Sequence, residues 1–253
     1  MRSTSLLAVC ALFSSAVCAT EFAEPEPVVD PYQAKFLKRQ VDQNMSVGRA
    51  IRSIASHYPQ DVVSIVDVAL EMYPEKYREI IFSAISAQPS STQAIVELAL
   101  EKEVSSCPAI VKLAISAEPS YVDFVVQAAA NATPEELDEI VRVAVMTEPN
   151  SADTIVQTLS REHPNKVIEI LTTALDTVPY VGEYVVDALL AIFPNQADDV
   201  VETAIRESST QREQVLRILE TAQDAGVSDE KIRGYGLNAG FSEEELAGVL
   251  NDK

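Results

Sequence analysis

Apolar and polar residues follow one pattern along residues 45–209, which repeats every 15 residues through eleven consecutive units without insertion or deletion. When each unit is numbered 1 to 15, positions 6 and 7 are almost always Ile or Val, position 10 is mostly Ala, and position 11 is usually aliphatic. Ile80, Ile81, Ala84 and Ile85 show this arrangement in one unit. Spacings of three and four residues place such side chains on one helical face, whereas a half-buried strand would alternate strictly. The pattern therefore predicts one amphipathic α-helix per unit.

Proline punctuates the pattern. Nine units end in proline, and the other two end in Val104 and Ser209. Proline has no backbone N–H and disfavours helical geometry in the residue before it, so each unit is expected to hold a helix of about 11–12 residues and a turn of about three. We expect N-caps directly after the prolines, at Ser90, Ser120, Asn150, Asn165 and Asn195. Thr133 and Glu136 have the spacing of a capping box.

A second period of 30 residues contains the first, because the segment 84–89 (AISAQP) recurs as 114–119 (AISAEP). Helices joined by such short turns run antiparallel. We therefore expect an all-α fold, an α-solenoid of stacked antiparallel helix hairpins with about 11 repeat helices and capping helices at both ends. Odd-numbered units would form one layer and even-numbered units the other. This design resembles that of tetratricopeptide and HEAT proteins in architecture only, since the chain has no tryptophan and lacks the tetratricopeptide motif.

Different segments are expected on either side of the array of residues 45–209. Residues 1–19 have the charge, apolar run and small residues of a secretory signal peptide, and residues 20–31 form an acidic, proline-containing lead-in. Residues 32–44 are expected to form an N-terminal capping helix. Residues 210–253 are expected to form a C-terminal helical cap with two 14-residue units, in which glycines end helices and serines begin them. Ser242 and Glu245 have capping-box spacing.

The charge and the cysteine content of the chain disfavour some functional classes. The chain holds 39 acidic and 19 basic residues, a net charge of −20. This charge disfavours binding to nucleic acids and to anionic membrane surfaces, which need lysine and arginine. No segment has the length and apolar character of a transmembrane helix. Two of the three cysteines lie in the predicted signal peptide, so Cys107 has no intrachain partner, and its place at an often apolar position predicts a buried thiol.

The sequence contains no catalytic or metal-binding motif. It has no HExxH, no paired CxxC, no glycine-rich phosphate loop and no calcium loop. The two histidines, His57 and His163, are far apart in the sequence and near the ends of different units. Pairs of acidic residues at helix starts are explained by the helix dipole. We therefore expect a protein without catalytic residues, cofactors or metal ions.

Two rows of position 8 residues are the candidate binding surfaces, because position 8 points away from the apolar face. The even-numbered units supply an acidic and amide row, the candidate partner-binding stripe: Asp67, Glu97, Gln127, Gln157 and Asp187. The odd-numbered units supply a partly basic alternative row: Arg52, Phe82, Lys112 and Arg142. Ordinary solvated helix faces would give the same residues, so the rows alone do not establish a binding site.

Three functions are compatible with these features to different degrees. The leading hypothesis is an exported, non-catalytic module that binds a protein or peptide, cationic if it meets the acidic row, or serves as a scaffold. The alternative is a self-assembling structural or surface-layer protein, whose homo-oligomers stack end to end. An enzyme is the least favoured class, because no acid–base pair is apparent. The signal peptide predicts a secreted protein, or a periplasmic one in a Gram-negative host.

Overall fold

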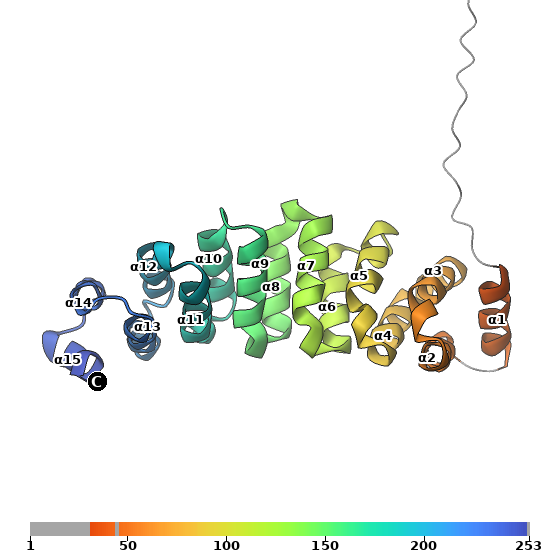
Figure 1. The fold of residues 1–253 in the computed structure, drawn as a ribbon, viewed down its shortest axis with the longest axis horizontal. Coiled ribbons are helices and arrows are strands. Elements are labelled where there is room, and N and C mark those ends of the chain that lie inside the picture. Colours follow the sequence, from red (N-terminus) through yellow and green to blue (C-terminus); the bar gives the residue numbers. More distant parts are fainter. Residues whose placement is uncertain (1–30, 44–45, 252–253) are drawn as a thin grey trace, which may run out of the picture.

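The chain forms an α-solenoid, seen in a computed structural model that describes residues 31–43 and 46–251. The described part contains fifteen α-helices and no strands, and the helices succeed one another along a single elongated row (Figure 1). The predicted fold class is therefore confirmed. The predicted signal peptide and most of the acidic lead-in lie outside the described residues.

One helix corresponds to each repeat unit, and terminal helices lie at both ends. The repeat helices are α2 (Val47–His57), α3 (Val62–Met72), α4 (Tyr77–Ala87), α5 (Thr92–Glu101), α6 (Cys107–Ala117), α7 (Val122–Ala132), α8 (Leu137–Thr147), α9 (Ala152–Glu162), α10 (Val167–Thr177), α11 (Gly182–Ile192) and α12 (Ala197–Glu207). The terminal helices are α1 (Pro31–Asp42), α13 (Arg212–Asp224), α14 (Asp229–Asn238) and α15 (Glu243–Asn251).

The helices pack in two layers, because each contacts its second neighbour along the chain as well as its first. Layer 1 holds the odd-numbered units, α2, α4, α6, α8, α10 and α12. Layer 2 holds the even-numbered units, α3, α5, α7, α9 and α11, and is extended by α1 at one end and α13 at the other. Each interior helix therefore packs between two helices of its own layer and against two of the opposite layer.

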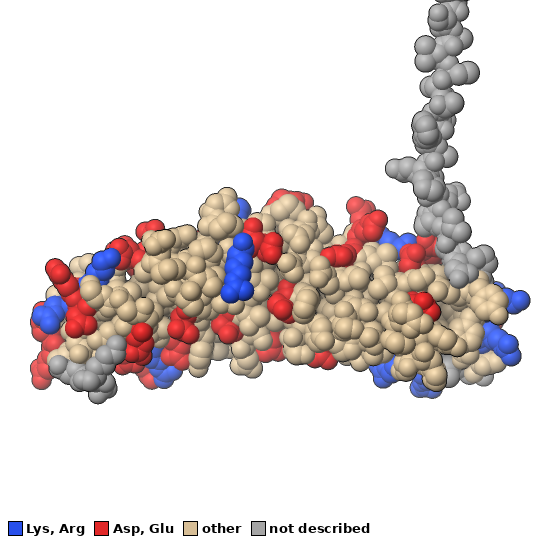
Figure 2. Space-filling model, viewed as in Figure 1, with Lys and Arg blue, Asp and Glu red and all other residues tan. Residues whose placement is uncertain are grey.

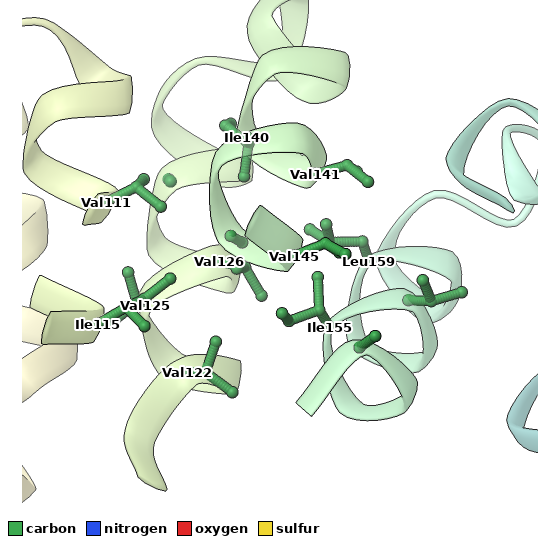
Figure 3. Packing of buried hydrophobic residues seen from close by; sticks show 14 of the residues in the cluster. Val111, Ile115, Val122, Val125, Val126, Ile140, Val141, Val145, Ile155 and Leu159 are labelled. Atoms are coloured by element: carbon green, nitrogen blue, oxygen red, sulfur yellow. The ribbon is translucent and has the colours of Figure 1, made fainter. Parts of the chain in front are cut away.

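The core runs along the whole array between the two layers. Every residue at positions 6 and 7 of the eleven units is at most 4% exposed, and the alanines at position 10 are fully buried. Figure 3 shows side chains of neighbouring repeats, such as Val145 of one and Ile155 and Leu159 of the next, lying close together in this core. Burying one such aliphatic side chain contributes about 1.5–3 kcal/mol. The small alanine side chain permits close approach of neighbouring helices, as the pattern predicted.

The turns between units are built differently from the prediction. The residue before each of the prolines that end a unit leaves helical geometry, as at Tyr73 (φ −138°, ψ 57°), because proline disfavours helical geometry there. At eight of the nine proline-ended units the proline then begins a three-residue 3-10 helix, such as Pro74–Lys76 or Pro134–Glu136, that leads into the next α-helix. At the ninth, Pro164 lies in a turn.

The predicted N-caps after the prolines are therefore wrong. Ser90, Ser120, Asn150 and Asn195 lie inside the 3-10 helices and Asn165 lies in a turn, while the residue that precedes each α-helix comes later and forms no side-chain cap. The capping box at Thr133 is also absent, because the Thr133 hydroxyl donates to Ala129 O at 3.0 Å and to Cys107 Sγ at 3.2 Å. The 3-10 turn satisfies backbone groups that a side-chain cap would otherwise serve.

The C-terminal cap follows the prediction more closely. Gly226 and Gly240 have positive φ angles of 94° and 84°, which permit the chain to end α13 and α14. Ser242 and Glu245 form the expected capping box, since Ser242 N–H donates to Glu245 Oε2 at 2.8 Å and Glu245 N–H donates to Ser242 Oγ at 3.3 Å. The α14 helix is tied back to α12 by Lys231, whose ammonium group lies 2.7 Å from Asp198.

Candidate functional site

The acidic and amide row lies on the outer surface of layer 2, one residue on each of five successive helices of that layer. Glu97 and Asp187 are exposed, and Asp67, Gln127 and Gln157 are partly exposed. The structure thus places the five predicted residues along one layer, in the order of the repeats. Figure 2 shows one face of the molecule, on which acidic side chains are distributed along much of the array.

Contacts between repeats occupy part of this row. Lys102, at position 13 of its unit, lies 2.6 Å from Asp67 Oδ1 and 3.0 Å from Glu71 Oε1 in the preceding layer 2 helix. Burial of the ammonium group opposes its charge, but the two carboxylates outweigh this and raise the pKa of Lys102. Gln127 Nε2 likewise donates to Glu162 Oε1 at 2.8 Å, again from position 8 to position 13 of the next layer 2 helix. These residues hold repeats together, so a partner would meet them already paired.

Glu97 and Asp187 retain accessible charge. Glu97 accepts a hydrogen bond from Gln93 Nε2 at 2.8 Å on its own helix. Among the residues that the structure describes, no lysine or arginine forms an ion pair with Glu97 or Asp187. The acidic character of the row therefore rests on these two carboxylates.

Two exposed aromatic side chains lie beside the row, on α7 and α11, and the sequence did not predict them. Phe124 is 41% exposed and Tyr184 is 58% exposed, each three residues before a row residue and thus on the same helical face. Phe124 packs against Tyr121 with ring centroids 5.5 Å apart. Hydrogen bonding to Glu183 and its charge raise the pKa of Tyr184. Both aromatic residues occupy position 5, where the other layer 2 repeats have small polar residues or alanine. This difference at position 5 is the sequence signal that could have identified them.

The alternative row lies on the outer surface of layer 1. Arg52, Phe82, Lys112 and Arg142 are all exposed, and Phe82 is 38% exposed. Arg142 Nε lies 3.4 Å from Glu139 Oε2 on the same helix. Position 8 of the next two layer 1 helices is Thr172 and Glu202, so the basic character ends partway along the array.

A cleft at the N-terminal end is another feature that the sequence did not predict. It lies between α1, the C-terminal end of α2 and the start of α3, and has a volume of about 410 Å³. Its lining residues are Tyr32, Gln33, Phe36, Ile54, Tyr58, Asp61 and Ile65. A smaller hollow of about 210 Å³ continues it along α2 and adds Gln40, Ser53 and His57. The aromatic residues Tyr32, Phe36 and Tyr58 are 82%, 39% and 50% exposed.

The cysteine and histidine residues lie apart from these surfaces or at their edge. Cys107 is a free, buried thiol, as predicted. Burial raises the pKa of the Cys107 thiol, against the hydrogen bond that Thr133 donates to it. His57 lines the smaller hollow and hydrogen-bonds through Nδ1 with Ser53 O at 2.7 Å. Within the described ranges, no three His, Cys, Asp or Glu side chains are placed to hold a metal ion.

Searches for related proteins give no guide to these surfaces. No protein-family model, curated protein or solved structure shows significant similarity to the chain. Within residues 31–43 and 46–251, no helix is both long enough and apolar enough to cross a bilayer. Function must therefore be argued from the geometry and chemistry of the array.

Proposed function

We propose that the protein is an exported, non-catalytic binding module that holds a cationic protein segment against the outer surface of layer 2. The observation that carries this proposal is the pairing of accessible acidic and aromatic side chains on one layer: Glu97 and Asp187 with Phe124 and Tyr184. Repeat arrays bind extended partners along such surfaces, because successive helices present equivalent positions at regular intervals. Exposed aromatic residues supply contact area, and unpaired carboxylates supply attraction for lysine and arginine.

The layer 2 row is favoured over the layer 1 row because its charged residues, Asp67, Glu97 and Asp187, all have the same sign. The layer 1 row begins with arginine and lysine and ends with Glu202, so a long charged partner would meet attraction at one end and repulsion at the other. Export is part of the proposal through the signal-peptide pattern of residues 1–19, which lies outside the described residues.

The experiment compares retention of a partner by the purified protein and two double variants. Extract and medium of the source organism are passed over each immobilised protein, and the salt-sensitive retained proteins are identified and quantified. The test variant carries Glu97→Lys and Asp187→Lys. The control carries Asp176→Lys and Glu202→Lys, which change net charge equally from exposed positions on layer 1. Asp67 is left unchanged because its ion pair with Lys102 joins two repeats.

A partner that the control retains and the test variant loses by about ten-fold or more would support the proposal, since each reversed contact is worth roughly 1 kcal/mol or more. Equal retention by both variants would overturn it. A third variant with Phe124→Ala and Tyr184→Ala tests the aromatic contribution without altering charge.

Self-assembly is a second candidate because the two ends of the array differ in charge. Residues 31–57 contain five Lys or Arg and one Asp, whereas residues 225–251 contain five Asp or Glu and two Lys or Arg. Opposite charges at the ends favour head-to-tail contact between copies. This candidate predicts a molar mass in light scattering that rises with protein concentration and falls with added salt. A constant monomer mass would exclude it.

A further inference from the structure

The hollow beside the N-terminal cleft has a position that the repeat geometry explains. Neighbouring helices of one layer make several contacts at a separation of 31 residues: Gly48 with Glu79, Glu71 with Lys102, and Ser86 with Ala117. Gln33 of α1 accepts a hydrogen bond from Ser64 of α3 at 2.6 Å, with the same separation. Helix α1 is therefore in register with layer 2 and acts as one more repeat helix.

In this register Phe36 of α1 takes the place of a core residue of later repeats, whereas the core positions 6 and 10 of α1 are the exposed Lys35 and Arg39. Phe36 corresponds to Val66 of α3, thirty residues later, and the Val66 side chain is fully buried whereas Phe36 is 39% exposed. The difference has a simple cause. Among the described helices, α3 is covered by two layer 1 helices, α2 and α4, whereas α1 packs against one, α2. Within the part of the chain that the structure describes, Phe36 therefore lacks the second layer 1 neighbour that Val66 has.

Helix α2 shows the same opening from the layer 1 side. In the next repeat, Ser83 of α4 is only 5% exposed because α2 packs on it, with Gly48 of α2 directly against Ser83 and Glu79. The equivalents of Ser83 and Glu79 in α2 are Ser53 and Arg49. Ser53 lines the hollow beside the cleft, and Arg49 is exposed. The hollow, which Phe36, Ser53 and Tyr58 help to line, therefore marks the place of one further layer 1 helix beside α1 and α2.

The charge around this open position differs from that of the array interior. Glu79 meets the preceding helix through a carboxylate, which accepts a hydrogen bond from Gly48 N–H at 3.0 Å, whereas its equivalent Arg49 would present a cation. Lys35, Lys38 and Arg39 of α1 are exposed as well. Figure 2 shows Lys and Arg side chains at this end of a chain whose net charge is −20. An incoming helix must therefore be acidic where the interior helices need not be.

We propose that the open position binds an amphipathic, acidic α-helix of a partner protein. The apolar face of that helix would pack on Phe36, Ile54 and Tyr58 in the hollow, and its acidic flank would meet Arg49. Binding of an amphipathic helix in an apolar groove is a common mode of peptide recognition. This site lies at the end of the solenoid and not on the outer surface of layer 2, so it stands apart from the function proposed above.

The chain itself supplies a suitable probe. Residues 134–148 form the layer 1 helix α8 with its 3-10 turn, and this segment is acidic and carries the apolar residues Leu137, Ile140, Val141, Ala144 and Val145 on its buried face. A synthetic peptide of residues 134–148, labelled at its N-terminus, is titrated with the purified protein and followed by fluorescence anisotropy. A peptide with Ile140→Ser and Val141→Ser serves as the probe control.

Saturable binding of the probe, lost with the serine-bearing peptide, is expected. Phe36→Ser should weaken binding about ten-fold or more, since one buried aromatic contact contributes more than about 1.4 kcal/mol. Phe82→Ser is the matched control, because Phe82 is 38% exposed on the outer surface of layer 1 and should leave binding unchanged. Arg49→Glu should weaken binding of the acidic probe and strengthen that of a peptide with Glu135→Lys and Glu136→Lys.

Three results would overturn the proposal. The first is a flat anisotropy titration with the folded protein, verified by circular dichroism. The second is equal weakening by Phe36→Ser and Phe82→Ser. The third is a concentration-dependent mass of the protein alone that Phe36→Ser abolishes, which would make a second copy the occupant. Tyr58→Ser repeats the test from the α2 side of the cleft if Phe36→Ser does not fold. None of these results alters the outcome expected for the Glu97 and Asp187 variants.

Discussion

The ammonium group of Lys102 lies 2.6 Å from Asp67 Oδ1, across the contact between α5 and α3. A second carboxylate, that of Glu71, lies 3.0 Å away, and the side chains of Lys102 and Asp67 are 21% and 30% exposed. Lysine at position 13 is thus a bridge between repeats, placed where the end of one layer 2 helix reaches the middle of the one before it. Two carboxylates that share one cation make the bridge sensitive to loss of that cation.

We expect Lys102→Met to destabilise the protein by about 0.5–1 kcal/mol, the range of a partly exposed ion pair. Methionine keeps the packing of the aliphatic stem but leaves Asp67 and Glu71 without their counter-charge. Urea unfolding at low salt measures the change, which should shrink in 1 M salt as screening takes effect. The control is Lys112→Met, an exposed lysine that forms no ion pair with any described residue. Equal effects of the two substitutions would contradict the bridging role.

A glycine at a helix contact should not tolerate a methyl group. A Cβ atom on Gly48 would lie 2.6 Å from Glu79 Cγ and 3.1 Å from Glu79 O, as well as against Ser83 Oγ. Gly48→Ala is therefore expected to destabilise the array by about 1–3 kcal/mol through overpacking, despite the better helix propensity of alanine.

Gly234→Ala is the matched control for this prediction. Gly234 lies inside α14, and a Cβ there meets no atom within 4 Å, so alanine should stabilise the protein by up to about 1 kcal/mol. Thermal or urea unfolding of the two variants gives the comparison. Stabilisation by Gly48→Ala would show that α2 and α4 are less closely packed than the structure has them.

The repeat unit that ends in Val104 instead of proline ends its helix in a different way. Helix α5 ends without proline, and Glu103 instead takes the left-handed conformation with φ 48°. Val104 N–H then donates to Ala99 O at 3.3 Å and Glu103 N–H to Leu100 O at 3.0 Å, the pair of bonds that defines a Schellman motif. The same bonds occur at Gly226 and Gly240. Glu103 therefore stands where glycine is the preferred residue.

We expect Glu103→Gly to raise the free energy of unfolding by about 0.5–1 kcal/mol, because glycine adopts positive φ without the Cβ clash. Urea unfolding checks this. Glu202→Gly, at an exposed position inside α12, should instead lower stability by about 1 kcal/mol. A loss of stability in both variants would mean that the left-handed residue is not a source of strain.

The sequence predicted the helices and layers well because they depend on a local pattern repeated eleven times. The apolar spacing around Ile80 and Ile81 determines which face is buried, and each repeat provides an independent sample of it. The N-cap at Ser90 was wrong because a side-chain cap and a 3-10 turn satisfy the same backbone groups, and the residue type does not distinguish them.

The cleft at α1 was beyond sequence reasoning for a different reason. Phe36 is an apolar residue of the type expected in a core. Its exposure depends on the absence of one neighbouring helix in the described structure. The ion pair and hydrogen bonds of the candidate row residues could not be predicted from the sequence either. The contact between Asp67 and Lys102 joins residues of different repeats, and only the offset of adjacent helices brings them together. The local pattern thus predicts which residues face outward, but not which of them are free of contacts with other repeats and can bind a partner.

Acid should loosen the C-terminal cap before the array. The backbone N–H of Ser242, the guanidinium group of Arg212 and the hydroxyl of Ser242 lower the pKa of Glu245 to about 2, from an ordinary value of 4.5. A carboxyl group whose pKa is lower in the folded state contributes stability above its ordinary pKa and loses it as pH falls through the folded value. The contribution of Glu245 is therefore complete at pH 5 and largely lost at pH 2.

Hydrogen exchange of the α15 amides, compared with those of α8 between pH 5 and pH 2, measures this loosening after correction for the intrinsic exchange rates. Protection of α15 is expected to fall first, because its capping box and the 2.6 Å ion pair with Arg212 both depend on the charge of Glu245. In Glu245→Gln the α15 amides should already be less protected at pH 5 and change less on acidification. Parallel loss of protection in α15 and α8, identical in the wild type and in Glu245→Gln, would show that the cap does not depend on this carboxylate.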